Sequence, residues 1–281
     1  ALMRRADKKP RKAAAKASQK LAAATPAEAF HLHRQAQAQR ARVLASVLIP
    51  LEGDYSIALR RAPDWRQACT EAWGPATGER SVATLRELLG LVGAHEWRKK
   101  GVEIPALGAP PLNRIHPHYG VFSPVRGEYV GLVAAAPLPS KALAFDIGVG
   151  TGVLSAVLAR RGVQRVVATD QDPRALACAR ANSPIEHAVY DEGSRMLKGF
   201  LAGLSAHLEP GGEGWLILSD LAEHLGLRPR EQLLAWIAEA GLVVRGRQDV
   251  KPVHAKAADA QDALHAARAA EVTSLWRLAA A

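Results

Sequence analysis

Hydrophobic and polar positions alternate at helical spacing through the first hundred residues. Thr25-Pro26-Ala27-Glu28 is typical of a helix start, with threonine as the N-cap, proline in the first turn and an acidic residue close behind. The spacing predicts two further helices, over residues 64–73 and 81–92. The apolar face of the second is formed by Leu85, Leu88, Leu89 and Val92. The pattern therefore predicts a mainly helical N-terminal domain.

A stretch rich in glycine and proline, residues 101–111, reads as a linker, and the pattern changes after it. Short apolar runs then alternate with helical patterns, which is typical of a sheet covered by helices on both faces. The predicted strands cover residues 142–146, 163–170, 215–219, 242–250 and 272–278, and the predicted helices 153–161, 172–182, 190–208 and 229–240. We predict an α/β fold over residues 113–281, preceded by a helical domain and linker over 1–112.

Charge is concentrated at one end of the chain. The net charge is +10, and residues 1–43 hold eleven lysines and arginines against Asp7 and Glu28. A dense cluster of cations gains free energy by releasing counterions from phosphates, so a nucleic acid partner is one interpretation. A solvated basic tail is the other, and composition does not separate the two.

The chemistry-bearing motif runs from Phe145 to Gly152, read as FDIGVGTG, between a predicted strand and a predicted helix. Glycines at this turn let the backbone approach a ligand closely. A dinucleotide fingerprint needs glycine or alanine where Val153 or Ser155 stands, and no Gly-Lys-Ser/Thr follows for a phosphate-binding loop. The motif therefore disfavours NAD and nucleoside triphosphates.

A second acidic residue, Asp170, ends the next predicted strand, 24 positions after Asp146. In folds with this strand-turn-helix order, a carboxylate at that place accepts hydrogen bonds from ribose hydroxyls. The pair of acids and the glycine turn together predict a nucleoside-containing cofactor.

This combination resembles motif I of the class I S-adenosylmethionine-dependent methyltransferases, whose sheet is Rossmann-like. The resemblance implies S-adenosylmethionine as cofactor, with Asp146 and the glycine turn at its methionine part, Asp170 at the ribose and Gln171 at the adenine edge. The expected cofactor-binding residues are Phe122, Asp146, Gly148, Val149, Gly150, Thr151, Gly152, Asp170 and Gln171.

The resemblance extends over about residues 113–281. Tyr119 to Pro124, read as YGVFSP, is similar to the segment that covers the cofactor in ribosomal RNA guanine-N2 and release-factor glutamine methyltransferases. Residues 208–212, read as LEPGG, resemble a turn common in these enzymes. The first group implies an RNA substrate, and the second a glutamine amide of a protein.

The chain departs from this group at its catalytic loop. The group carries Asn-Pro-Pro followed by an aromatic residue after its fourth strand, and no such tetrapeptide occurs here, so the catalytic residues are unknown. Too few residues separate the predicted helices 172–182 and 190–208 to hold the third and fourth strands. We predict that a segment with this loop is missing between Asn182 and Ser183, which would place Glu186 and His187 shortly after the loop; a genuine deletion with a degenerate site is the alternative.

These observations predict an N-methyltransferase acting on a ribosomal or transfer RNA base, in the cytoplasm. Protein glutamine methylation and non-catalytic RNA binding are the alternatives. No apolar run is long enough to span a membrane, and the two cysteines do not predict disulfides. Two His-x-His pairs, His31/His33 and His116/His118, lack further ligands, so no metal is expected. His118 and Tyr119 could border the pocket or pack on the sheet. The tryptophans at 65, 73 and 97 are expected in the core rather than stacked on bases.

Overall fold

The computed structural model describes residues 25–125, 127–182, 195–253, 259 and 262–281. The chain divides into two compact units. The first unit comprises residues 1–101 together with 117–120, and the second comprises 102–116 and 121–281. Each unit has its own core.

The first unit combines helices with a small sheet. Its elements are α3 (Pro26–Ala45), β1 (Leu48–Leu51), α4 (Arg66–Trp73), β2 (Ser81–Thr84) and α5 (Leu85–Lys100). The predicted start of α3 is confirmed: the Glu28 amide donates to Thr25 Oγ1 (3.3 Å), and the Thr25 amide donates to the Glu28 carboxylate (2.8 Å). This reciprocal pair is a capping box, which satisfies two backbone donors at the helix start.

The prediction of one helix over residues 81–92 was wrong at its beginning. Residues 81–84 form β2, which pairs antiparallel with β1 in the register Leu51↔Ser81 to Leu48↔Thr84. Thr84 then caps α5, because its side chain accepts a hydrogen bond from the Glu87 amide at 3.0 Å. The buried face of α5 holds Leu88 and Leu91, whereas Leu89 is exposed.

The core of the first unit lies between α4, α5 and the sheet. Its buried members are Leu51, Trp65, Ala68, Cys69, Ala83, Leu88 and Leu91. Of the three tryptophans expected in the core, Trp65 is there, Trp97 is exposed, and Trp73 is partly exposed with its ring edge-on to Tyr55.

The second unit begins with residues that the sequence predicts as a linker. They carry secondary structure instead, because β3 (Val102–Glu103) pairs with β4 (Arg114–Ile115), and the 3-10 helix η1 (Pro105–Leu107) lies between them. Val102, Ile104 and Ile115 are buried in the core of this unit. The apolar residues of this stretch therefore pack into the core of the second unit, although the stretch also contains three prolines.

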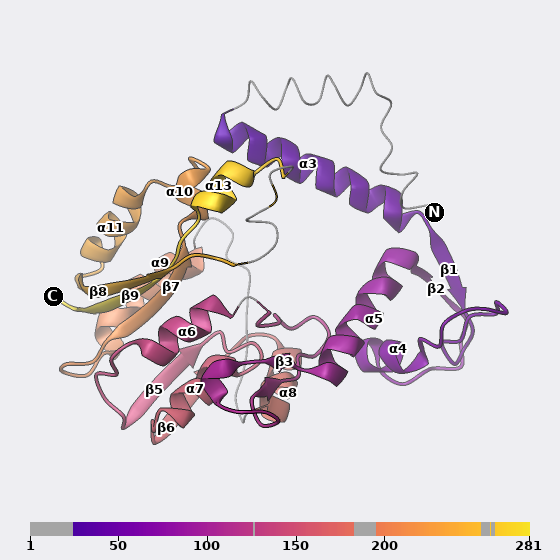
Figure 1. Ribbon diagram of the computed structural model, residues 1–281, viewed down its shortest axis with the longest axis horizontal. Helices are drawn as coiled ribbons and strands as arrows, with labels where there is room; N and C mark the ends of the chain where they lie inside the picture. Colours follow the sequence, from indigo (N-terminus) through magenta and orange to yellow (C-terminus); the bar gives the residue numbers. More distant parts are fainter. Residues whose placement is uncertain (1–24, 126, 183–194, 254–258, 260–261) are drawn as a thin grey trace. The chain divides into compact units, whose positions relative to one another are not determined.

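The predicted alternation of strands and helices is present in the second unit (Figure 1). Its further elements are α6 (Glu128–Ala135), β5 (Leu143–Ile147), α7 (Val153–Arg160), β6 (Arg165–Thr169), α8 (Pro173–Asn182), α9 (Arg195–Leu204), η3 (Ser205–His207), β7 (Gly214–Ser219), α10 (Leu221–His224), α11 (Arg230–Glu239), β8 (Leu242–Val250), α13 (His265–Ala270) and β9 (Thr273–Ala280). The α/β class is confirmed, although α6, α10 and α13 were not predicted.

The strands of the second unit form separate sheets. β5 and β6 are parallel, with Asp146 opposite Ala168, and β7, β9 and β8 form an antiparallel sheet in that order. Both sheets contribute to one apolar cluster that includes Val130 of α6, Val157 of α7 and Leu275 of β9. In the part of the chain that the structure describes, these strands therefore do not form one continuous sheet.

Candidate functional site

The turn after β5 has a backbone that only glycine adopts easily. Gly148, Gly150 and Gly152 have φ values of 82°, 53° and 80°. Side chains with a Cβ rarely occupy this left-handed region, so the single-residue spacing of the glycines is a conformational requirement. The amides of Gly148 and Val149 donate to the Thr169 carbonyl at 2.9 and 3.3 Å, which ties the turn to the end of β6.

Asp170 lies next to this turn, as the sequence predicts. One carboxylate oxygen accepts a hydrogen bond from the Gly150 amide at 3.0 Å. The other accepts from the amides of Gln171 at 2.8 Å and Asp172 at 3.4 Å. The structure therefore brings the glycine turn and Asp170 together at the carboxyl ends of two parallel strands, which is where ligands bind in sheets of this kind.

Asp146 lies in β5, before the glycine turn, and is buried. Its carboxylate accepts a short hydrogen bond of 2.5 Å from the Ser155 hydroxyl in the first turn of α7. Burial raises the pKa of Asp146, because the apolar surroundings disfavour the charged form more than the Ser155 hydrogen bond favours it. Burial and the nearby carboxylate also raise the pKa of Tyr129. Asp146 thus supports the turn from within; its predicted contact with the methionine part stays a prediction.

The start of α7 adds a polar backbone feature to the site. Gly152 is its N-cap in the left-handed conformation, and the flanking residues Val149, Thr151 and Val153 are buried. The first amides of a helix have no carbonyl partner within the helix and carry partial positive charge. The glycines leave room for a ligand against the backbone, the first amides of α7 are hydrogen-bond donors, and the carboxylate after the neighbouring strand is an acceptor. An adenosyl group with a carboxylate tail requires this combination. The residues present therefore fit S-adenosylmethionine.

Two further predicted cofactor residues lie at the surface. Phe122 is 62% exposed, and it stands between Gly120, whose φ is 80°, and the buried Pro124. Gln171 is exposed directly after Asp170. Their predicted contacts with the cofactor stay predictions. Glu186 and His187, expected after the catalytic loop, lie outside the described residues.

Sequence reasoning missed Ser155 and Asn182. Ser155 follows Gly152 by three positions, which places it in the first turns of α7 facing the strand, and that spacing could have identified it. Asn182 forms hydrogen bonds with the backbone of His116, 66 residues away, and no local sequence pattern predicts a contact over that separation.

The described residues hold no group of three or more His, Cys, Asp and Glu side chains suited to a metal ion. Cys69 and Cys178 are free and buried. Among the described helices, none has the length and apolar character needed to cross a membrane.

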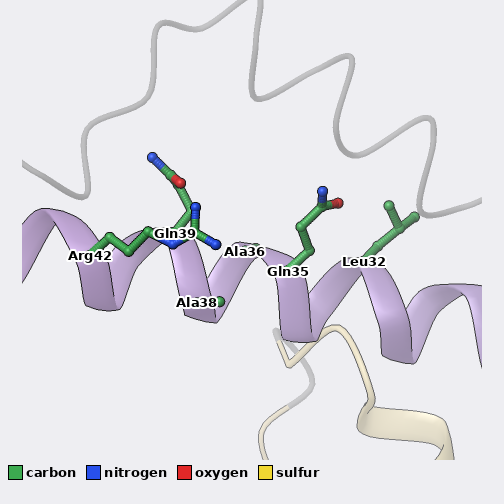
Figure 2. A pocket seen from close by; sticks show the side chains of 6 residues that line it. All are labelled: Leu32, Gln35, Ala36, Ala38, Gln39 and Arg42. Atoms are coloured by element: carbon green, nitrogen blue, oxygen red, sulfur yellow. The ribbon is translucent and has the colours of Figure 1, made fainter.

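A pocket lies elsewhere, along α3 of the first unit (Figure 2). The residues that line it are Leu32, Gln35, Ala36, Ala38, Gln39 and Arg42. All of them belong to one helix, and none is an acid or a nucleophile. The glycine turn belongs to the second unit, so this pocket is no part of the candidate site.

Residues 136–193, which include the glycine turn and Asp170, match the family model described as ribosomal protein L11 methyltransferase (PrmA). The match covers a minor part of the chain. It confirms the predicted enzyme class and cofactor, a methyltransferase that uses S-adenosylmethionine. It does not assign the chain to the ribosomal RNA guanine-N2 or release-factor groups of these enzymes. No match was found among curated proteins.

Similar solved structures include the ribosomal protein L11 methylase from Lactobacillus delbrueckii subsp. bulgaricus, 15% identical over 56% of this chain and 80% of that one, with a TM-score of 0.37. An S-adenosylmethionine-dependent methyltransferase from Mesorhizobium loti is 16% identical over 54% of this chain and 97% of that one, with a TM-score of 0.38. One from Geobacter sulfurreducens, in complex with S-adenosyl-L-homocysteine, is 14% identical over 67% and 98%, with a TM-score of 0.37.

Proposed function

We propose that this protein transfers a methyl group from S-adenosylmethionine to a nitrogen atom of an RNA base. The observation that carries the cofactor part is the arrangement at the ends of β5 and β6, where three glycines with positive φ lie beside the Asp170 carboxylate. The cofactor supplies an activated methyl group when it is bound. The protein's own task is then to hold and orient the two reactants, which is worth several orders of magnitude in rate.

Each residue of the site has a part in this binding. Asp170, whose carboxylate accepts from three backbone amides of the turn and the following residues, accepts hydrogen bonds from ribose hydroxyls. The glycine turn lets the backbone lie against the methionine part, and Phe122 covers an apolar part of the cofactor. Ser155 keeps the Asp146 carboxylate in place beneath the turn.

The RNA part of the proposal is supported by the charge of the N-terminal region. Of the eleven basic residues in positions 1–43, Arg34, Arg40 and Arg42 lie on α3, and all three are exposed. Cations on an exposed helix bind phosphates without reading sequence, and the acceptor site of the methyltransferase unit would then read the base.

A protein acceptor is the second candidate, because the matched family is named for a ribosomal protein. The two are separated by incubating the enzyme with methyl-labelled cofactor and an undermethylated cell extract, followed by RNase or protease. Label lost to RNase supports an RNA base. Label that survives RNase and is lost to protease contradicts it and supports a protein acceptor, such as a glutamine amide.

We further propose that the acceptor-binding loop belongs to a segment between Asn182 and Ser183. Within the described part of the chain, β5 pairs only with β6, and β7 only with β9. Ala144 packs toward α7, whereas Phe145 and Ile147, on the opposite face of β5, are 58% and 60% exposed. Parallel strands are normally covered on both faces, so an uncovered face and two unpaired edges support an additional strand.

A further inference from the structure

The backbone of His116 and the side chain of Asn182 form a reciprocal pair of hydrogen bonds. The His116 amide donates to Asn182 Oδ1 at 2.6 Å, and Asn182 Nδ2 donates to the His116 carbonyl at 3.0 Å. A carboxamide presents one acceptor and two donors in a plane, as a peptide group does. Asn182 therefore pairs with His116 as a residue on a neighbouring strand would.

The identity of this residue is closely constrained. Its Nδ2 group also donates to the Cys178 carbonyl of the preceding helical turn at 3.0 Å, so the side chain is held on α8 as well as on His116. The Cys178 thiol lies 3.7 Å from the same His116 carbonyl and is fully buried. Aspartate would keep the acceptor but lose every donation from Nδ2, which includes one to the Cys178 thiol at 3.5 Å, and alanine would lose all of these hydrogen bonds.

Helix α8 connects this contact to the candidate site. It begins at Pro173, three residues after Asp170, and ends at Asn182. Ten helical residues span about 15 Å. Phe122, six residues after His116, belongs to the second unit, as do both ends of α8.

We propose that Asn182 is a positioning residue for Phe122, which lies in the segment 119–124 that resembles a cofactor cover. It fixes the entry of this segment to the same helix that follows Asp170, so that Phe122 and Asp170 keep one spacing. Asn182 itself does not touch the cofactor in this account. The proposal rests on the proposed function, because it gives the segment a cofactor to cover.

The test compares Asn182→Ala and Asn182→Asp with Ala181→Gln, which changes an exposed neighbour on the same helix. Hydrogen exchange of the His116 amide is measured together with S-adenosylmethionine affinity by calorimetry, well below each variant's unfolding midpoint. We expect about tenfold faster exchange and five- to tenfold weaker binding in Asn182→Ala, since hydrogen bonds of this kind each contribute about 1 kcal/mol. Asn182→Asp should keep more His116 protection yet also bind more weakly, and Ala181→Gln should match the unsubstituted protein.

Two results would overturn the proposal. Unchanged His116 exchange in Asn182→Ala would show that the side chain does not hold the segment. Faster exchange with unchanged affinity would show that the segment's anchoring does not matter for the cofactor. A lowered unfolding midpoint without weaker binding would overturn the proposal as well. Failure of the unsubstituted protein to bind the cofactor is a separate outcome, which defeats the proposed function itself.

Discussion

Asp146 lies in β5 and Asp170 directly follows the neighbouring strand β6, but their carboxylates have opposite environments. Asp146 is buried under α7 with Ser155 as its hydrogen-bond partner, whereas Asp170 receives three backbone amides near the surface of the turn. The first environment penalises a charge, and the second stabilises one. The two residues should therefore respond differently to substitution.

Asp146→Asn should stabilise the protein more at pH 8 than at pH 4. The pKa of Asp146 is raised by burial, so its contribution to stability is complete below the unfolded-state pKa and is lost as the pH rises through the folded-state pKa. Asparagine keeps an acceptor for Ser155 without the buried charge. Thermal unfolding at both pH values measures the difference.

Asp172→Asn is the matched control for Asp146. The hydrogen bond from Arg174 lowers the pKa of Asp172, so this carboxylate contributes stability above its unfolded-state pKa and loses it as the pH falls. Its substitution should cost more at pH 8 than at pH 4. If Asp146→Asn changes the unfolding midpoint equally at both pH values, ionisation of the buried carboxylate does not contribute to the pH dependence of stability.

Asp170→Ala should weaken S-adenosylmethionine binding by roughly 10- to 100-fold, because hydrogen bonds to charged groups contribute about 1.5 to 3 kcal/mol. Asp170→Asn keeps an acceptor for the Gly150 amide and separates the ribose contact from support of the turn. Asp172→Ala, two residues away, should bind normally. Calorimetry with the three variants tests this assignment, and unchanged affinity in Asp170→Ala would remove Asp170 from the ribose site.

Among the elements, α3 depends on its capping box. Thr25→Ala removes the side chain that accepts from the Glu28 amide, and such losses typically cost about 1 kcal/mol. We expect lower helicity and faster exchange of the first amides of α3, with little effect on the second unit. Circular dichroism and hydrogen exchange check this. Unaltered exchange at residues 27–29 would show that the box does not hold the helix.

The elements show where local patterns suffice. The start of α3 was predictable because its capping partners are three residues apart, and the strand, glycine turn and helix over residues 143–160 were predictable for the same reason. The strand at Ser81–Thr84 was not, because its partner β1 lies over 30 residues earlier and its pairing replaces helical hydrogen bonds. Linker composition at 101–111 likewise gave no sign that Ile104 would be buried.

Among the described residues, one edge of β5 has no partner strand, and this leads to a prediction about mass. If a strand and loop belong between Asn182 and Ser183, the protein isolated from its source should exceed 30.0 kDa by several kilodaltons, with the excess in the peptide that contains Asn182. Intact mass spectrometry and peptide mapping measure this. A mass of 30.0 kDa with a contiguous Asn182-Ser183 peptide would contradict it and favour a degenerate acceptor site.

At the scale of the whole molecule, the candidate site is better determined than the acceptor. Apart from Phe122, the cofactor residues come from one strand, the turn after it and the end of the next strand, so the sequence could predict them together. In our proposal, acceptor recognition depends on distant elements and on the charge of residues 1–43, and composition alone does not separate RNA binding from solvation of that charge. The cofactor is therefore the claim on which the remaining proposals depend.

Calorimetric titration of the full chain with S-adenosylmethionine tests that claim most directly. The account predicts saturable binding at one site per chain, with NAD giving no heat under the same conditions. Absence of binding at millimolar S-adenosylmethionine would contradict it, because the glycine turn and Asp170 would then have no adenosyl ligand to hold.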